Sequence, residues 1–404
     1  VRNPHNKDFK YYYPTNDLVT GPDILFFWVA RMIISGYELE KKMPFKNVYF
    51  TGIVRDKDRR KMSKSLGNSP DPIKLIDQYG ADSVRIAMLF ASPAGNDLLF
   101  DESLCKQGRN FTNKIWNAHR LVNSWDIKDT EPTESELVLI NWFENKLNKS
   151  VIKLNKLFLE FRISDCLMLL YKLVWDDFCS CYLEIIKPYN KEISCVTIDR
   201  TNKFFEKILI CLHPFMPFIT EELFQNIVSD DHFQSISLSK WPAINQSEID
   251  EKIITEFAHI LELISFIRKI RIDKKIPSSK SLKLLVDDKK ILSFSVILSK
   301  TCNLEKIELF NDHEGELFPF LVGVHQYYIP SVFNVNISEE IKNISQKINY
   351  FEGFLSVVYK KIKNKNFMNN APKNVIDIEL KKEKDTLEKI KSLRMQLNSL
   401  NERD

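Results

Sequence analysis

The stretch Lys61-Met62-Ser63-Lys64-Ser65-Leu66-Gly67-Asn68 gathers two lysines and two serines in a short polar loop. The β-branched and aromatic run 47–54 before it predicts a strand, and Asp71-Pro72 after it predicts a helix that ends near Gly80. A loop in this position offers ammonium and hydroxyl groups to a polyphosphate. A solvated basic loop is the alternative interpretation, because nearby positions are also basic: Arg55, Lys57, Arg59 and Arg60.

Residues 1–105 alternate expected strands, loops and helices, which predicts an α/β domain with a parallel sheet. The apolar run Leu18-Val19-Thr20-Gly21 is followed by Pro22, a residue favoured at the first position of a helix. We expect that helix to run from Asp23 to about Gly36.

Residues 106–280 are expected to be helical almost throughout and to form a helix bundle. Pro214 and Pro217 interrupt the pattern, and Thr220 is expected to cap the next helix. Four aromatic side chains have a helical spacing that favours core packing over an exposed binding role: Trp142, Phe143, Trp175 and Phe178.

Residues 281–335 change to alternating apolar and polar positions, which predicts a small α+β unit. Residues 336–404 carry apolar residues at steps of three and four, starting Ile341, Ile344, Ile348, and predict an antiparallel coiled-coil hairpin. A helix pair packed flat on the body is the alternative. The second helix is expected to carry its seam on five residues: Leu380, Leu387, Ile390, Leu397 and Leu400. Arg394 falls on the register set by the first two, so we expect it to weaken the seam. Lysines near the tip suit either phosphate contact or simple solubility: Lys347, Lys360, Lys361, Lys363, Lys365 and Lys373.

Composition restricts the class of protein more than its function. The chain has 404 residues, 44% of them hydrophobic, and a formal net charge of +4, which excludes a disordered chain and is too small to indicate a nucleic-acid partner. Its seven cysteines show no metal-ligand spacing, so we expect reduced thiols, no metal site and a cytoplasmic protein. We expect neither a signal peptide nor a membrane span.

The polar loop resembles the second signature motif of the class I aminoacyl-tRNA synthetases, and its surroundings resemble the valine-specific branch of that family. The similar segments follow the family order along the chain: 20–32, 44–56, 80–85, 109–117, 213–223, 241–242, 268–277 and 369–372. The resemblance implies the C-terminal half of a Rossmann-like nucleotide-binding domain in residues 1–105. It further implies an anticodon-binding helix bundle in 106–280 and a tRNA-binding coiled-coil arm in 336–404.

The same resemblance implies roles for single residues. Lys64, assisted by Lys61, would hold the ATP triphosphate and stabilise the departing pyrophosphate, while Ser63 and Ser65 would shape the loop. Gly21 would let the nucleotide approach the backbone closely. Asp23 would accept a hydrogen bond from the ribose, or would be an ordinary first-turn acid.

Ile24 and Trp28 stand one helical turn apart and so share a face, and the resemblance implies that this face lines the valine pocket. Core packing of an apolar helix is the alternative interpretation of both. Thr51 occupies a position where many relatives carry a histidine, and we assign it no catalytic role.

The implied reaction uses ATP with Mg²⁺ to activate valine and transfers it to tRNA(Val). None of the seven histidines fits a His-x-Gly-His signature, so we expect the first half of the nucleotide fold to lie in an absent N-terminal half of the same enzyme. The chain is then expected to be an inactive fragment by itself. The alternatives are a tRNA-binding fragment and an isoleucine- or leucine-specific relative.

Overall fold

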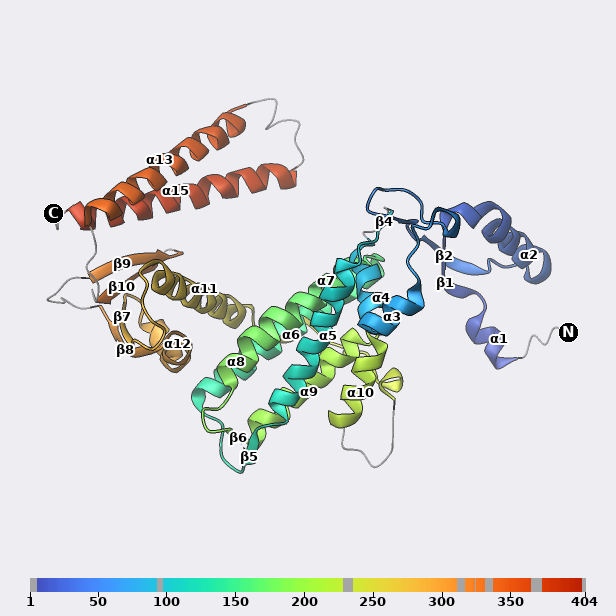
Figure 1. The fold of residues 1–404 in the computed structure, drawn as a ribbon, viewed down its shortest axis with the longest axis horizontal. Helices are drawn as coiled ribbons and strands as arrows, with labels where there is room; N and C mark the ends of the chain where they lie inside the picture. The colour runs from blue at the N-terminus through green and yellow to red at the C-terminus, as the bar shows by residue number, and fades with distance from the viewer. Residues whose placement is uncertain are drawn as a thin grey trace. The chain divides into compact units, whose positions relative to one another are not determined.

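The computed structural model describes residues 6–92, 97–227, 235–310, 317–323, 325–330, 337–364 and 373–401 (Figure 1). The chain divides into two compact units, Val1–Ile254 and Thr255–Asp404. Helices dominate both units, and the sheets are small. The finer domain boundaries expected from the sequence stay predictions.

The first unit begins with a two-stranded parallel sheet. After the short helix α1 (Lys7–Tyr12), strand β1 (Thr15–Thr20) pairs in parallel with β2 (Phe45–Phe50), as the alternating pattern predicted. The predicted strand 47–54 is wrong in its extent, because β2 ends at Phe50. A separate strand, β3 (Val54–Arg55), pairs in parallel with β4 (Leu98–Leu99).

The helix between β1 and β2 differs from the expected single helix 23–36. It opens as the 3₁₀ turn η1 (Pro22–Ile24), continues as the π-helix η2 (Leu25–Val29) and becomes regular only in α2 (Ala30–Glu40). The Ala30 N–H donates to the Leu25 carbonyl, five residues back, which is the bond that defines a π-helix. Apolar periodicity alone does not distinguish these helix types.

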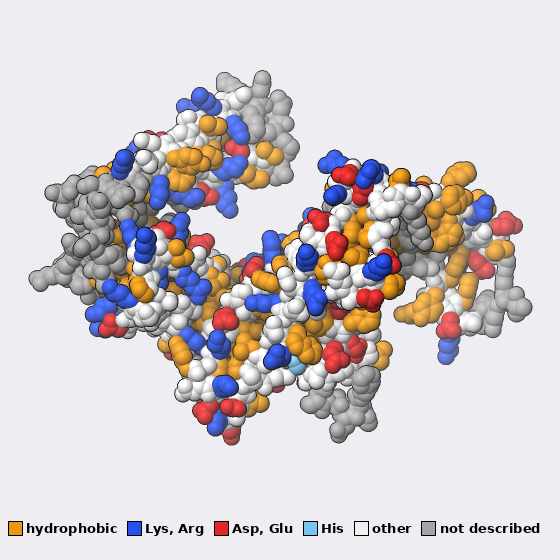
Figure 2. Space-filling view, viewed as in Figure 1, with side chains coloured by type: hydrophobic (Ala, Val, Ile, Leu, Met, Phe, Trp, Pro, Cys, Tyr) orange, Lys and Arg blue, Asp and Glu red, His pale blue; other side chains and the backbone are white. Residues whose placement is uncertain are grey.

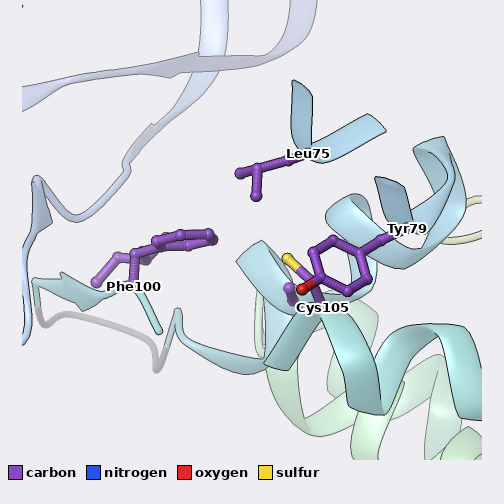
Figure 3. Packing of buried hydrophobic residues seen from close by; sticks show 6 residues of the cluster. Leu75, Tyr79, Phe100 and Cys105 are labelled. Carbon is purple, nitrogen blue, oxygen red and sulfur yellow. The ribbon is translucent and has the colours of Figure 1, made fainter. Parts of the chain in front are cut away.

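Two short helices follow the polar loop. Asp71 caps α3 (Pro72–Tyr79) by accepting from the Ile73 N–H at 3.0 Å, which confirms the predicted helix start. Helix α4 (Ala81–Phe90) comes directly after Gly80, whose φ of 90° suits the sharp turn between them. These helices, β4 and α5 (Ser103–Val122) enclose a small apolar cluster, shown in Figure 3: Leu75, Tyr79, Ala87, Leu98, Phe100 and Cys105.

The rest of the first unit is a bundle of helices. Besides α5 it contains α6 (Glu134–Leu159), α7 (Ile163–Lys172), the π-helix η4 (Leu173–Tyr182), α8 (Leu183–Ile186), α9 (Cys195–Leu212) and α10 (Pro217–Ile227). Two short strands, β5 (Asp126–Lys128) and β6 (Glu192–Ser194), pair in parallel beside it. The 3₁₀ turns η5 (Ile236–Leu238) and η6 (Gln246–Glu248) follow α10.

The bundle core is aromatic. Trp142, Phe143 and Phe178 are almost completely buried, which confirms core packing as the better interpretation of these three side chains. Phe143 packs against the rings of Phe178 and Tyr182, with centroids 5.3 and 4.9 Å away, and these two rings also stack on each other. Trp175 differs, because it is half-buried and the Lys114 ammonium lies 5.5 Å from the centre of its ring.

Helix α4 joins the α/β part to the bundle. The buried Asp82 carboxylate accepts from the backbone N–H groups of Phe218 and Ile219, at 3.3 and 2.8 Å, and so caps α10. The expected cap, Thr220, is wrong: α10 begins at Pro217, and the Thr220 hydroxyl lies inside it and donates to the Met216 carbonyl. An acceptor 138 residues before Thr220 is outside the reach of local pattern analysis.

Two further contacts fix the position of α4. Arg85 donates to the carbonyls of Pro214 and Phe215, at 2.9 and 3.1 Å, just where α9 gives way to α10. Gly108 of α5 lies directly against the backbone of Ser83, and a Cβ at this glycine would come within 2.5 Å of the Ser83 carbonyl oxygen. The helices can approach this closely only because residue 108 has no side chain.

The second unit holds a four-stranded mixed sheet with strand order β8-β7-β10-β9. Its strands are β7 (Leu282–Val286), β8 (Leu304–Leu309), β9 (Leu317–Val322) and β10 (His325–Pro330), with η7 (Lys289–Phe294) and α12 (Ser295–Cys302) between β7 and β8. Helix α11 (Glu251–Asp273) leads into this unit. Its buried Arg271 donates to four backbone carbonyls, which ties the end of the helix to the sheet: Pro277, Lys280, Cys302 and Asn303.

The chain ends in a helical hairpin of α13 (Ile337–Ile362) and α15 (Lys373–Asn401), which pack along each other (Figure 1). The predicted seam on α13 is confirmed, since Ile344, Ile348, Leu355 and Val358 are buried. The predicted turn motif 369–372 lies outside the described residues. So does the tip lysine Lys365, and nothing is described of the Lys373 side chain.

The predicted seam on α15 is wrong at Leu380 and Leu387 and confirmed at Ile390. Leu380 and Leu387 are 41% and 43% exposed, whereas Glu379, Thr386 and Ile390 are buried. Arg394 therefore lies beside the seam and not in it, and its guanidinium donates to Glu352 at 2.6 Å. The positions of α15 that pack against α13 include polar residues. Sequence analysis based on apolar periodicity does not assign polar residues to a seam.

Candidate functional site

The polar loop is organised around one buried carboxylate, that of Asp56. Its Oδ1 accepts from the backbone N–H groups of Asp58 and Arg60, at 3.0 and 2.8 Å. Its Oδ2 accepts from the Arg60 guanidinium at 3.0 Å and from the Asn68 amide at 2.9 Å. These bonds, with that from Asn68 the strongest influence, lower the pKa of Asp56 to about 2.

Asn68 closes the loop from its far end. Besides donating to Asp56, it accepts from the Ser63 N–H at 3.0 Å and donates to the Lys61 carbonyl at 3.4 Å. The Ser63 hydroxyl in turn lies 3.0 Å from that of Ser65 and accepts from the Leu66 N–H at 3.2 Å. The two serines thus shape the loop through hydrogen bonds within it.

Met62 anchors the middle of the loop. Its N–H donates to the Val54 carbonyl at 3.2 Å, and its side chain packs against the apolar cluster of Figure 3. Residues 61 and 55 form an antiparallel bridge directly beside it. The loop is therefore held by apolar packing on one side and by the Asp56–Asn68 network on the other.

Lys61 connects the loop to the end of β1. Its ammonium lies 3.2 Å from the Asp23 carboxylate, which belongs to the 3₁₀ turn after Gly21. The backbone N–H of Asp23 and this ion pair lower the pKa of the Asp23 carboxyl. Two segments 38 residues apart, each predicted from the sequence to bind ATP, thus meet at one point.

The remaining predicted residues are placed less completely. The backbone of Lys64 opens the 3₁₀ turn η3 (Lys64–Leu66), but the predicted role of its side chain lies outside what the structure describes. Gly21 has an ordinary φ of −77°, so no left-handed conformation requires glycine there. A Cβ at position 21 would nevertheless come within 3.2 Å of the Asp23 carboxylate.

Ile24 and Trp28 stand on the segment where the helix changes type. Trp28 is 42% exposed, and its neighbours Leu25, Phe26 and Phe27 are 45%, 86% and 55% exposed. Figure 2 shows hydrophobic side chains gathered over this part of the unit. Core packing within the described chain therefore does not account for Trp28, and the pocket role of both residues stays a prediction.

Sequence reasoning missed Asp56 and Asn68. Asp56 stands in a charged run that looks like a solvated turn, and Asn68 follows Gly67, whose φ of 64° marks the end of the loop. These two residues order the loop because they contact each other although they are 12 residues apart in the sequence. Neither a helix period nor a strand period predicts such a contact.

The described residues offer neither a cluster of metal ligands nor a helix that could span a membrane. They contain no group of three or more His, Cys, Asp or Glu side chains placed to hold a metal ion. Within the same ranges, every helix is either too short or too polar to cross a bilayer.

Three family models match the chain in succession. That for class I tRNA synthetases (I, L, M and V) matches residues 1–101. That for the anticodon-binding domain of tRNA ligases matches 141–286, and that for the valyl tRNA synthetase tRNA binding arm matches 336–401. These matches support a class I synthetase fold with an anticodon-binding domain.

Curated relatives resemble the chain along almost its entire length. The valine–tRNA ligases of Phocaeicola vulgatus and Christiangramia forsetii are each 48% identical to it over 99% of the chain, and that of Fusobacterium nucleatum is 39% identical over 98%. The first two are matched over only 46% of their own length, so the chain spans about half of such a relative.

Among solved structures, the LeuRS of Agrobacterium radiobacter K84, in a ternary complex with tRNA and LeuAMS, overlaps 60% of this chain and 29% of its own. Its identity is 20% and its TM-score 0.45, which is too low to support any conclusion. The sequence relatives and the ordered family matches confirm the predicted resemblance. The chain belongs to the valine–tRNA ligase family of class I tRNA synthetases.

Proposed function

We propose that the chain is the C-terminal part of a cytoplasmic valine–tRNA ligase, which activates valine with Mg²⁺-bound ATP and transfers the valyl group to tRNA(Val). The observation that carries this proposal is the contact between Lys61 and Asp23 at 3.2 Å. It joins the phosphate loop to the end of the first parallel strand, where nucleotides bind in open α/β sheets. Similarity to valine–tRNA ligases over 99% of the chain supports valine as the amino acid.

In the proposed reaction the valine carboxylate attacks the α-phosphate of ATP and pyrophosphate leaves. Lys61 and Lys64 hold the triphosphate and stabilise the negative charge that develops on the pyrophosphate. Asp23 accepts a hydrogen bond from the ribose, for which it must release Lys61. Both side chains are more than half exposed, and an exposed ion pair contributes little, so this exchange costs little free energy.

The amino-acid pocket is proposed to include Ile24 and Trp28. Their apolar side chains suit the branched side chain of valine, and the indole of Trp28 is bulky enough to exclude larger ones. Substituting Trp28 by alanine is expected to weaken discrimination against isoleucine.

The N-terminal part of the same enzyme is proposed to complete the active site. Purely parallel sheets are normally buried, with both faces covered. The parallel sheet of β1 and β2 has only two strands, so we expect the N-terminal part to cover and complete it. The exposed apolar side chains of η2 and α2 give such a partner a surface to cover: Leu25, Phe26, Phe27 and Ile34. We therefore expect no activity from this chain alone, and valine-dependent exchange of pyrophosphate into ATP by the purified chain would contradict this.

The bundle and the hairpin are proposed to bind tRNA, as the names of the two matching family models suggest. A fragment that only binds tRNA is compatible with the same observations. An isoleucine- or leucine-specific relative is the other alternative. Binding of the chain to purified tRNA species at a fixed salt concentration distinguishes this alternative from the proposal. Preference for valine tRNA supports the proposal, and preference for isoleucine or leucine tRNA contradicts it.

The decisive test of the loop uses Lys64→Ala in the enzyme assembled with its N-terminal part. We expect valine-dependent exchange of pyrophosphate into ATP to slow by about 10²-fold or more, because one lost contact to developing charge costs about that much. The KM for valine should change little. Lys57→Ala, an exposed lysine in the same loop region, is the matched control. A raised valine KM with an unchanged rate would contradict the role of Lys64.

A further inference from the structure

The second unit contains a groove of about 880 Å³ at the root of the hairpin. Helix α11 and strand β9 form one wall, and α13 and α15 form the other. The groove lies outside the polar loop, and Lys347 is the one groove residue among the lysines that the sequence analysis considered for phosphate contact. Its lining combines two kinds of side chain, long cations and aromatic rings.

The cations come from three different helices. Lys269 extends from α11 and Lys274 directly follows the last residue of that helix, while Lys347 extends from α13 and Lys389 from α15. Asp273 is the acidic residue among the lining side chains. Four positive charges and one negative charge within a single groove give a local excess of three, in a chain whose net charge is only +4. Such a concentration favours an anionic ligand.

The aromatic rings hold two of these lysines in place. The Lys274 ammonium lies 5.1 Å from the centre of the Phe318 ring, and the Lys389 ammonium lies 5.7 Å from that of Phe351. Of the other three rings in the lining, Phe320 is buried, whereas Tyr350 and Phe266 are 70% and 43% exposed. Their faces are available to a planar ligand.

We propose that this groove binds an unpaired nucleotide of structured RNA, with its base stacked on Tyr350 and the flanking phosphates on the four lysines. Stacking on aromatic rings together with cationic contact to the backbone is how proteins hold single-stranded nucleotides. The proposal rests on the proposed function, which makes tRNA the RNA concerned. It extends the RNA surface beyond residues 336–401, since Lys269, Lys274 and β9 precede that segment.

The surface of α13 continues the groove toward the hairpin tip. Phe354 and Val357 follow Tyr350 by four and seven residues, so all three share one face of the helix. They are 40% and 54% exposed, which extends the apolar strip along the hairpin. An RNA strand seated at Tyr350 can therefore follow the hairpin without leaving a continuous surface.

The first experiment measures binding of the 404-residue chain to valine tRNA at several salt concentrations. We expect Lys269→Ala with Lys274→Ala to lower the slope of log K against log salt by one to two units, since each lost phosphate contact lowers it by about 0.7 to 0.9. Lys283→Ala with Lys290→Ala is the matched control, because these exposed lysines belong to the same unit but do not line the groove. A slope equal to that of the wild type in the groove variant would overturn the proposal.

The second experiment separates stacking from charge. Tyr350→Ala should weaken binding about tenfold with the salt slope unchanged, whereas Tyr350→Phe should bind like the wild type. Equal binding by all three proteins would overturn the stacking role. Thermal unfolding followed by circular dichroism confirms that the variants compared are folded.

Two further outcomes have defined meanings. If polyglutamate displaces the tRNA as effectively as unlabelled tRNA does, at equal charge concentration, the groove is a general anion site and the RNA proposal fails. If groove variants bind like the wild type while the assembled enzyme still shows valine-dependent exchange, this proposal fails and the proposed function stands.

Discussion

Asp56 and Asn68 show how single residues can hold a site whose proposed chemistry belongs to others. Neither offers a charge to ATP in the proposed mechanism, yet together they fix both ends of the loop that carries Lys61 and Lys64. Holding the loop in one conformation before ATP arrives reduces the entropy that binding must later remove. The charged residues of this loop could be predicted from the sequence, but the residues that order it could not.

Removing the Asn68 side chain amide should therefore loosen the loop without unfolding the protein. We expect Asn68→Ala to speed tryptic cleavage at Arg59, Arg60, Lys61 or Lys64 several-fold, because proteolysis follows the population of the open loop. Limited digestion followed by mass spectrometry of the fragments measures this directly.

Asp58→Ala is the control for that experiment, since Asp58 is in the same turn, and its exposed carboxylate pairs with Arg60 and, within the described residues, not with Asn68. Cleavage of Asn68→Ala at the rate of the wild type would show that the Asp56–Asn68 contact does not order the loop.

The hairpin illustrates what is predictable about whole elements. Both helices and the seam of α13 follow from apolar periodicity, which depends on local geometry alone. The seam of α15 follows from it at Ile390 but not at Leu380 and Leu387, because the partner helix decides which face is buried. Glu379 is buried there and pairs with Lys361 and Lys382, at 3.7 and 2.8 Å. A carboxylate can be buried when cations pair with it, and a hydrophobicity pattern does not contain that information.

The corrected seam makes a prediction that the original register does not. Ile390→Ala should destabilise the second unit by roughly 2–4 kcal/mol, as expected for a buried aliphatic side chain, and Leu387→Ala by less than about 1 kcal/mol. Under the register first predicted, the two substitutions would cost similar amounts. Urea unfolding followed by far-ultraviolet circular dichroism compares the two costs.

Tryptophan fluorescence provides an internal control for this comparison. All six tryptophans lie at or before Trp241, so their signal reports on the first unit. The fluorescence transition should be the same in both variants, and a shift of that transition by Ile390→Ala would show that the substitution acts on more than the hairpin.

Across the whole molecule, the order of helical and mixed segments was predictable, and the contacts between segments were not. The parallel strand pairs, the bundle core and the sheet elements after residue 281 follow from periodicity and turn residues. The connection of α4 to α10 depends on Asp82 and Arg85, whose partners lie about 130 residues away. Long-range hydrogen bonds of this kind leave no local trace in one sequence.

Replacing Asp82 tests that connection. Burial raises the pKa of its carboxyl, while the N–H groups of Ile219 and Phe218 oppose the rise. Asp82→Ala removes the acceptor of both groups and should destabilise the first unit by about 1–3 kcal/mol. Urea unfolding followed by tryptophan fluorescence measures the loss. Asp77→Ala, on the exposed face of neighbouring α3, should stay within about 0.5 kcal/mol of the wild type.

Buried histidines should make the molecule less stable in acid. Burial lowers the pKa of His119, His213 and His259, so the unfolded chain binds more protons than the folded chain once the pH falls below about 6.5. Stability is therefore full above that pH and decreases as the pH falls toward the lowered values. Melting temperatures at pH 7.5 and 5.5 test this, and His119→Gln should reduce the difference between them. A difference unaffected by that change would exclude His119 as a contributor.

The junction at α4 also has a mechanical consequence. Helix α9 has 18 residues, a length of about 27 Å, and Arg85 donates to the carbonyls of Pro214 and Phe215 just beyond its last residue, Leu212. Close-packed interiors are barely compressible, so a force applied at the far end of α9 would reach α4 with little loss. Helix α4 is the second helix after the polar loop, so we expect strain in the bundle to be felt close to that loop.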